Sequence, residues 1–252
     1  MLPPPGTAQV FMAHPDRLLA SAPGSEAWLS KEEHARAARY RRPADRTGYL
    51  ATRALVRGIL ARALARPPDA LRFQEGPHGR PSLEPDAAAG LAFNASRTPA
   101  WVALVVTGGM ACGVDVENVH RRADVDSIAR AFAPAERDLL HRTPAPERRR
   151  TFFRLWTLKE AFLKARGTGL AGGLDACSFS LPAGAAPRAT FARSLGDDTR
   201  GWSFQLLEPD PDHLLAVAFA SASPPRLDVS GEEATCRAVR EAAGKPDGSP
   251  RA

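Results

Sequence analysis

Two adjacent glycines near the middle of the chain separate two segments that carry the same order of predicted elements. Ahead of Gly108 and Gly109, a short strand is followed by helices and then by three strands, and after them the same order begins again. Glycine pairs interrupt regular structure, so the second segment starts from a new element. A duplicated order of this kind indicates a chain that folds as two α+β halves of similar plan, although no repeat is visible residue by residue.

The limits of the predicted elements follow from apolar spacing, caps and breakers. Ser30 to Glu33 has the pattern of a capping box at a helix start, and Pro67 with Pro68 ends the next helix. In the first half we expect a strand over 9–13, helices over 30–41 and 45–65, and strands over 71–75, 92–95 and 101–106, with a turn over 76–81. In the second half we expect a strand over 112–117, helices over 125–132, 134–141 and 147–166, and strands over 176–181, 202–207 and 214–220.

These elements divide the chain into three predicted parts. Residues 1–109 form an N-terminal half, 110–226 a C-terminal half, and 227–252 a flexible tail. From position 221 onward proline, serine, glycine and charged residues dominate, a composition that favours disorder. The alternative for the tail is one weak helix over 232–243.

Charge and cysteine content limit the classes of function. The chain has 34 basic and 28 acidic residues, and the net charge of +6 favours anionic partners such as nucleotides or acidic protein surfaces. The arginines are scattered without interleaved aromatics, which argues against nucleic acid. The three cysteines lie far apart, which argues against a thiolate zinc site. We expect a cytoplasmic protein without membrane association, because the N-terminus lacks a signal peptide and the longest apolar run, 101–106, is too short to span a bilayer.

Two short motifs carry the candidate catalytic groups. In the segment 113–117 (GVDVE), two acids alternate with valines on a strand-like stretch, so both acids project from one face. In the segment 156–164 (WTLKEAFLK), Glu160 and Lys164 lie four residues apart on a helix-like stretch and share one face. Each motif alone is typical of a solvated strand face or a surface ion pair. If the two motifs meet in space, three carboxylates and a lysine converge, and such a site suits a hard cation and a bound polyphosphate.

The combination of the two motifs resembles the 4′-phosphopantetheinyl transferases of the surfactin-synthetase-activating type. The resemblance extends to flanking segments, which lie in the expected order between Arg36 and Phe179. These segments are GRP at 79–81, FNAS at 93–96 followed by Trp101 and Val102, the helix-like stretch 132–140 that contains Glu136, and GTGL at 167–170. The resemblance implies two pseudo-symmetric α+β halves with coenzyme A in the cleft between them.

The implied activity is transfer of the 4′-phosphopantetheine arm of coenzyme A to a serine hydroxyl of an apo-acyl or apo-peptidyl carrier protein, with release of adenosine 3′,5′-bisphosphate. The implied metal ligands are Asp115, Glu117 and Glu160, which hold Mg²⁺ against the pyrophosphate and suit Mn²⁺ equally. Lys164 neutralises or protonates the leaving phosphate. Lys159, about 100° from Glu160 around the helix, is expected to contact a phosphate.

The base that takes the serine proton stays open at this point. The candidates are Glu160, Glu117 and a metal-bound water, with Glu136 as a further one. The catalytic set is therefore expected to consist of Asp115, Glu117, Glu160 and Lys164, with the division of roles undecided.

The 3′-phosphate of coenzyme A requires cations of its own. By the same resemblance Arg80, Ser96 and Arg97 form part of this pocket, and Arg36 and Arg53 contribute from the N-terminal helices. Arg97 stands where the family usually has histidine. Arginine binds phosphate bidentately but does not titrate near neutral pH, so we expect Arg97 to bind the phosphate and not to exchange protons.

Two other functions are compatible with the same residues. The acids acting on water would make a Mg²⁺-dependent hydrolase of nucleotide pyrophosphates, and a chain without chemistry would be a module that binds coenzyme A or a carrier. For docking an acidic carrier, the candidates are Arg137, Arg142 and the run 148–150, although a solvated helix start explains the run equally well. The resemblance also implies a monomer, because the duplicated halves supply their own interface.

Overall fold

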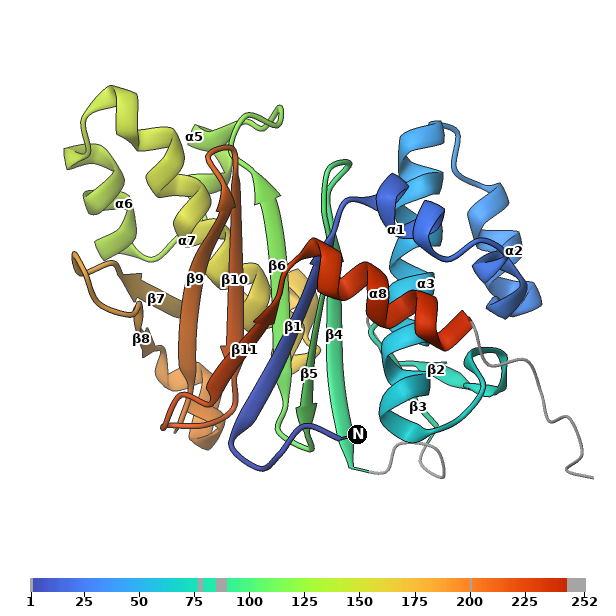
Figure 1. The fold of residues 1–252 in the computed structure, drawn as a ribbon. Coiled ribbons are helices and arrows are strands. Elements are labelled where there is room, and N and C mark those ends of the chain that lie inside the picture. The colour runs from blue at the N-terminus through green and yellow to red at the C-terminus, as the bar shows by residue number, and fades with distance from the viewer. Residues whose placement is uncertain (1, 77–78, 85–89, 200, 244–252) are drawn as a thin grey trace, which may run out of the picture.

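The structure is a computed structural model that describes residues 2–76, 79–84, 90–199 and 201–243. Two β-sheets pack face to face in the middle of the molecule, and helices cover the outer face of each sheet (Figure 1). This arrangement confirms the expected α+β class. None of the helices within the described ranges is long and apolar enough to cross a membrane.

The first sheet has four strands in the order β11-β1-β5-β4. They are β1 (Thr7–Ala13), β4 (Leu91–Arg97), β5 (Val102–Gly108) and β11 (Arg226–Ser230). The helices of this half are α1 (Pro15–Ser21), α2 (Lys31–Ala38), α3 (Pro43–Leu64) and α8 (Glu232–Ala243). The small elements are η1 (Ser25–Trp28), η2 (Pro68–Ala70) and a hairpin of β2 (Phe73–Glu75) and β3 (Pro81–Leu83). The apolar cluster between the sheet and α1, α3 and α8 forms the core of this half.

The second sheet has three antiparallel strands in the order β6-β10-β9. They are β6 (Cys112–Asn118), β9 (Ser203–Asp210) and β10 (His213–Phe219). The helices are α5 (Val125–Ala129), α6 (Pro134–Arg142) and the long α7 (Ala145–Arg166), which lies across the sheet. The remaining elements are η3 (Gly169–Gly172), η4 (Arg193–Thr199) and a hairpin of β7 (Cys177–Ser180) and β8 (Arg188–Phe191).

Strand alternation decides which layer each side chain meets. In β10, Leu214 and Ala216 pack under α7, whereas Leu215 and Val217 pack between the two sheets. All four are completely buried, which is possible because the sheet has apolar layers on both faces.

Most of the expected elements are present, with shifted ends. The capping box at the start of α2 is confirmed, because Ser30 Oγ accepts from the Glu33 amide at 3.3 Å and Glu33 Oε2 accepts from the Ser30 amide at 2.9 Å. Pro43 begins α3 as its first residue, although the sequence predicted the helix from Asp45; a proline in this position needs no amide hydrogen. The strands β3, β8 and β11 were not expected.

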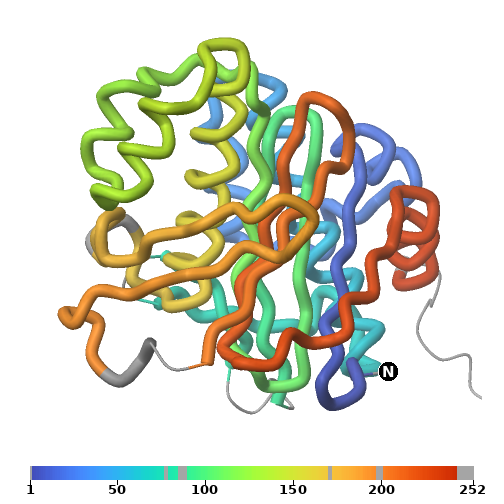
Figure 2. The backbone as a smooth tube through the Cα atoms, turned by 90° about the vertical axis from the view of Figure 1, so that its left-hand side faces the viewer, coloured from blue at the N-terminus to red at the C-terminus, as the bar shows by residue number. Residues whose placement is uncertain are grey.

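For the described part of 227–252 the prediction of a flexible tail is wrong, and the alternative of a helix over 232–243 is confirmed by α8, which has these bounds. Strand β11 runs parallel to β1, and α8 packs on α1 and α3, so the red C-terminal segment lies beside the blue N-terminal strand in Figure 2. Val239 of α8 is completely buried, and a Cβ on Gly58 of α3 would lie 3.1 Å from its Cγ1. The polar composition concealed this because β11 is stabilised by backbone hydrogen bonds to β1, which composition does not report. Residues 244–252 lie outside the described residues.

Candidate active site

The candidate active site lies where helix α7 crosses strand β6 at close range. Gly113 faces the helix, and a Cβ at this position would overlap the backbone of Ala161 and Ala165. Glycine is therefore the residue that lets the two elements approach. The two acids of β6 follow on the same face of the strand, so the close crossing brings them to the acid and the lysine of α7.

Asp115 has one carboxylate oxygen fully engaged and the other without a partner. Its Oδ1 accepts from Lys164 Nζ at 2.6 Å and from Ser96 Oγ at 2.9 Å. Its Oδ2 is buried and has no hydrogen-bond partner among the residues that the structure describes, and Asp115 as a whole is 4% exposed. A buried carboxylate oxygen that lacks a donor is energetically costly, so this atom is suited to bind a cation or another donor.

Glu117 differs from Asp115 because both of its oxygens have donors. Arg121 binds it with two contacts, from Nε at 2.6 Å and from Nη2 at 3.0 Å, and Trp156 Nε1 donates at 2.7 Å. Burial, and then the charge of Asp115, raise the pKa of Glu117, whereas the contacts from Arg121 and Trp156 oppose this rise. Glu117 is thus fixed in place by neighbouring side chains.

Glu160 carries the most perturbed carboxyl group of the site. Its pKa rises from 4.5 to about 7, first because it is partly buried and then because of the charge of Asp115; Lys164 opposes the rise and Glu117 adds to it. The acids of β6 and α7 therefore interact strongly, and the predicted meeting of the two motifs is confirmed by the ion pair between Lys164 and Asp115. A carboxyl group that titrates near neutral pH is suited to proton transfer.

The residues of the site fit a divalent cation, although they do not form a complete centre. Among the described residues, no three aspartate, glutamate, histidine or cysteine side chains are arranged as a ready metal site. The unpartnered oxygen of Asp115 and the destabilised charge of Glu160 are nevertheless the groups that a cation would stabilise. Mg²⁺ is commonly held by one or two carboxylates together with substrate phosphate, which is compatible with an incomplete set of protein ligands.

The structure corrects the expected role of Lys159. Its side chain is 1% exposed, and Nζ pairs with Glu136 Oε2 at 2.7 Å and donates to the carbonyl of Leu174 at 2.6 Å and to that of Cys177. An ammonium group sealed in this way does not reach a phosphate. Glu136 is completely buried as well, so it does not take part in proton transfer at the site.

An arginine-lined cavity of about 730 Å³ lies beside the acids, between α2, α3, β2 and β4. Six arginines and three glutamates line it, so it suits an anion. Arg36, Arg53 and Arg97, all expected to bind phosphate, belong to its wall. Glu33 binds Arg53, and Arg36 pairs with Glu75 at 2.8 Å. Buried Nε of Arg53 has no partner within the described residues.

Strand β4 lies between the cavity and the acids. Ala95 and Arg97 line the arginine cavity, while Asn94 and Ser96 face β6. Asn94 Oδ1 accepts from the Val114 amide at 3.0 Å, and Ser96 Oγ accepts from the Val116 amide at 3.3 Å. Successive residues of one strand thus serve the cavity and the acid cluster, which joins the two halves at the site.

Arg80 is placed differently from expectation. Its guanidinium donates to the carbonyls of Ala165 at 2.6 Å, Cys112 at 3.2 Å and Phe93 at 3.5 Å, and the residue does not belong to the wall of the arginine cavity. It ties β4, β6 and the end of α7 together. These contacts do not support a role in binding the 3′-phosphate.

The arginines expected to dock a carrier are largely occupied by contacts within the chain. Arg149 donates from Nε to the carbonyl of Val119 at 2.6 Å and from Nη2 to that of Arg121, and Arg150 pairs with Glu208 at 2.7 Å. Arg149 therefore fixes the loop that carries Arg121 toward Glu117. The contacts favour the structural alternative for this part of the run.

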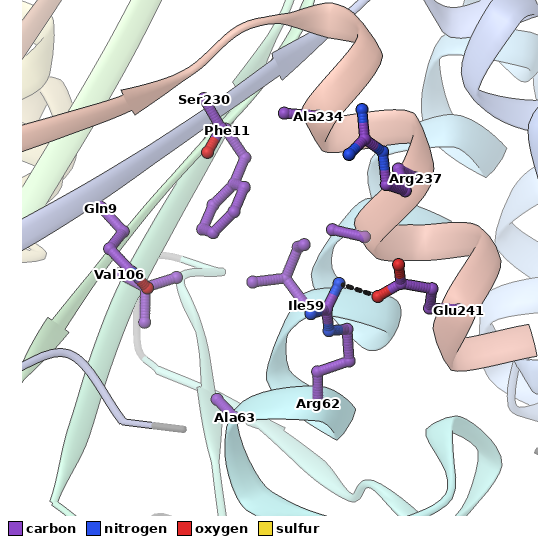
Figure 3. A pocket seen from close by; sticks show the side chains of 11 residues that line it. Gln9, Phe11, Ile59, Arg62, Ala63, Val106, Ser230, Ala234, Arg237 and Glu241 are labelled. Carbon is purple, nitrogen blue, oxygen red and sulfur yellow. Dashed lines mark ion pairs between the residues drawn. The ribbon is translucent and has the colours of Figure 1, made fainter.

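A second hollow lies away from the acids. It has a volume of about 360 Å³ and lies between β1, β5, α3 and α8. Phe11, Ile59 and Val106 form an apolar floor, and the ion pair between Arg62 and Glu241 crosses its rim at 2.9 Å (Figure 3). Asp115, Glu117, Glu160 and Lys164 do not line this hollow, so it is separate from the candidate active site.

Comparison with protein families identifies the chain. Residues 111–218 match the profile of the 4′-phosphopantetheinyl transferase superfamily, and residues 24–108 match that of the 4′-phosphopantetheinyl transferase N-terminal region. The two matches together cover both halves of the fold and include both motifs. The chain belongs to the 4′-phosphopantetheinyl transferase superfamily.

Individual relatives agree with this assignment. A relative from Synechocystis sp., whose name assigns it to the 4′-phosphopantetheinyl transferases, is 38% identical over 69% of this chain and 70% of its own length. The 4′-phosphopantetheinyl transferase HetI of Nostoc sp. is 34% identical over 77% of this chain and 79% of its own length. The transferase Sfp of Bacillus subtilis is more distant, at 26% identity over 77% of this chain and 83% of its own length.

Three contributors to the site were not found from the sequence. Trp156 and Asn94 were only parts of motifs without a role of their own, and Arg121 was not singled out. The donors from Trp156 and Arg121 to Glu117 depend on the crossing of α7 and β6, and on the path of the loop after β6. Only the i, i+4 spacing of Glu117 and Arg121 was a signal in the sequence, and it is a weak one outside a helix.

Proposed function

We propose that this chain transfers the 4′-phosphopantetheine arm of coenzyme A to a serine hydroxyl of an apo-acyl or apo-peptidyl carrier protein. The serine oxygen forms a bond to the phosphorus of the phosphopantetheine unit. The pyrophosphate bond of coenzyme A breaks, and adenosine 3′,5′-bisphosphate leaves. The membership of the family supports the reaction, and the single observation that carries it is the unpartnered Oδ2 of Asp115 beside Glu160 and Lys164.

The residues of the cluster receive distinct roles in this proposal. Asp115 and Glu160 hold Mg²⁺, for which Mn²⁺ is an alternative, and the cation when bound neutralises charge on the pyrophosphate. Glu117, which Arg121 and Trp156 already bind, supports the site from the side. Lys164 reaches the site from α7 with a 29% exposed side chain and neutralises the phosphate that leaves.

Glu160 is our candidate for the group that accepts the serine proton. When no cation is bound, burial and then the charge of Asp115 raise the pKa of Glu160 to about 7. A cation held by one oxygen of Glu160 would lower this pKa, so the group would accept the serine proton on the carboxylate oxygen that the cation leaves free. Glu136 is excluded from this role because it is completely buried. Lys159, its partner, is excluded from phosphate binding for the same reason.

The arginine cavity takes the nucleotide end of coenzyme A in this proposal. Arg97 and Ser96 are consecutive residues of β4, so the nucleotide phosphate and the pyrophosphate would be bound on the two sides of the end of one strand. We further propose that the protein acts as a cytoplasmic monomer of the surfactin-synthetase-activating type. The similarity to Sfp is consistent with this type.

Mass spectrometry of an apo-carrier protein tests the proposal. The protein is incubated with coenzyme A, Mg²⁺ and a fatty acid, polyketide or nonribosomal peptide carrier, and the intact mass of the carrier is recorded. We expect a gain of one phosphopantetheine. Asp115→Asn should lower the rate at least about a hundredfold, whereas the control Asp126→Asn, at an exposed position of α5, should leave it unchanged.

Other outcomes of this assay would identify a different function. Breakdown of coenzyme A without a gain in carrier mass would indicate a hydrolase that uses the same acids on water. Binding of coenzyme A with neither breakdown nor transfer, across all three carrier classes, would indicate a binding module. Either result would contradict the proposed transfer.

A further inference from the structure

Arg97 contacts a pair of tyrosines, of which Tyr49 lines the arginine cavity and Tyr40 does not. Its Nη2 donates to the hydroxyl of Tyr40 at 2.8 Å. The guanidinium carbon lies 5.4 Å from the ring centre of Tyr40 and 5.7 Å from that of Tyr49. The two rings are 5.4 Å apart and tilted by 36°, so they form one aromatic support under the guanidinium.

The support is built into the fold of the first half. Tyr49 is 6% exposed, and Gly48 beside it on α3 leaves room for the Arg97 stem, because a Cβ there would meet Arg97 Cδ at 3.4 Å. Tyr40 follows α2 and does not belong to the wall of the cavity, although Arg97 and Tyr49 do. Tyr40 therefore contacts Arg97 without itself lining the cavity.

These contacts orient the guanidinium of Arg97 without neutralising its positive charge. Three of the other five arginines of the cavity are paired with carboxylates: Arg36 with Glu75, and Arg53 and Arg57 with Glu33. Arg97 has neutral partners, and in the part of the chain that the structure describes it has no carboxylate partner. An arginine whose fork is oriented but not neutralised is suited to a doubly charged phosphate monoester, which it binds through two donors.

We propose that Tyr40 is a positioning residue that orients Arg97 toward a phosphate monoester on the nucleotide, so that this chain discriminates coenzyme A from dephospho-coenzyme A. The inference rests on the proposed function, because it assigns the nucleotide of coenzyme A to the arginine cavity. Beyond that function, the inference is that discrimination between coenzyme A and dephospho-coenzyme A depends on the Tyr40 hydroxyl. A mobile guanidinium at this exposed position would lose more conformational freedom on binding.

The test compares two substrates in one variant. Tyr40→Phe removes the hydroxyl and keeps the ring. We expect it to raise the KM for coenzyme A about tenfold, the effect of one hydrogen bond to a charged group, with kcat and the KM for dephospho-coenzyme A unchanged. Arg97→Ala should raise the KM for coenzyme A further, and Tyr40→Phe should add nothing in the Arg97→Ala background. Arg41→Ala, which removes an exposed neighbouring charge, serves as the control.

Calorimetric titration separates this inference from the proposed function. Wild type should bind adenosine 3′,5′-bisphosphate more tightly than adenosine 5′-monophosphate, and Tyr40→Phe should reduce this preference about tenfold. An equal loss for both nucleotides, no loss, or an additive effect in the Arg97→Ala background would overturn the role of Tyr40. If wild type modified no carrier, the proposed function would fail, while the titration would still decide the role of Tyr40.

Discussion

Two lysine–carboxylate pairs lie on the same helix, α7, and they differ in what they leave unsatisfied. Lys159 meets Glu136 at 2.7 Å, and Lys164 meets Asp115 at 2.6 Å. The side chains of the first pair are 1% and 0% exposed, and those of the second are 29% and 6% exposed. The distances are almost equal, so distance does not separate a structural pair from a functional one.

The first pair is complete in itself. Glu136 accepts from the amides of Ala133 at 3.1 Å and Phe179 at 2.9 Å in addition to Lys159, and Lys159 also donates to two backbone carbonyls. These contacts join α6, α7 and β7 in the core of the second half. No donor or acceptor in this pair lacks a partner among the described residues.

The second pair is incomplete. Asp115 retains an oxygen without a donor, and burial and nearby carboxylates raise the pKa of Glu160. The comparison teaches that the two pairs differ in unfilled hydrogen-bonding capacity, and the proposed function places the ligand at the pair that has such capacity. The predictions below test that difference.

The largest effect on stability is expected from Lys159→Met. This change leaves the buried carboxylate of Glu136 without its counterion, which should destabilise the fold by about 3–5 kcal/mol. Chemical denaturation measures it, and the transferase activity per folded molecule should be retained. Adding Glu136→Gln should recover much of the loss, while Lys31→Met at an exposed site is the control. A large loss of activity without loss of stability would refute the structural role.

Lys164→Met is the matching change in the second pair, and it should lower kcat more than it lowers the stability of the fold. Loss of the ammonium leaves the buried Asp115 with Ser96 as its donor, so we expect a loss of stability that is smaller than in Lys159→Met because the ammonium is partly exposed. The same change should lower kcat about a hundredfold to a thousandfold if Lys164 neutralises the leaving phosphate. Carrier mass kinetics and a thermal melt of the same preparation measure both quantities. A melting temperature that fell as far as in Lys159→Met would abolish the contrast between the two pairs.

Glu160 should make stability and metal affinity depend on pH in opposite directions. Because its folded pKa is raised to about 7 from 4.5, the folded state binds more protons than the unfolded state between these values, so its contribution to stability falls as pH rises. Glu160→Gln should therefore raise the melting temperature by a few °C at pH 8 and not near pH 4. Affinity for Mg²⁺ or Mn²⁺ in wild type should weaken about tenfold per pH unit below 7, since the carboxyl group must lose its proton.

The smallest effect is expected from Trp156→Phe. The indole donates one hydrogen bond to Glu117, which Arg121 continues to hold with two contacts, so the rate should fall only about fivefold. Trp28→Phe, in the first half, is the matched control. A loss as large as that expected for Asp115→Asn would mean that Trp156 and Glu117 are as central as the Asp115–Lys164 pair.

Local patterns were enough to predict several parts of the site. The alternation of acids and valines in 113–117 correctly assigned Asp115 to the face opposite the valines, because side chains alternate along any strand. The spacing of Glu160 and Lys164 predicted a shared helix face, and the capping box marked the start of α2. The family resemblance added the expectation that the two motifs meet, which neither motif contains.

Other features depended on contacts between distant segments. Composition assigned 227–252 to a flexible tail, but β1 offers β11 a row of backbone partners, and α3 offers α8 an apolar face. Arg80 has the charge for a phosphate, yet three carbonyls from other elements surround its guanidinium. A side chain's partners are set by what the fold places around it, and local sequence does not contain that information.

The sequence by itself determined the fold class, the family and the face on which each acid of the strand lies, because these follow from local periodicity and from motifs of fixed spacing. Only the tertiary structure decided which lysine of α7 is sealed and which stays open. Both lie on one helix with similar neighbours in sequence, but α6 and β7 enclose Lys159, whereas Lys164 faces β6 and the end of β4. Packing of separate elements therefore determines which lysine keeps a partly exposed side chain.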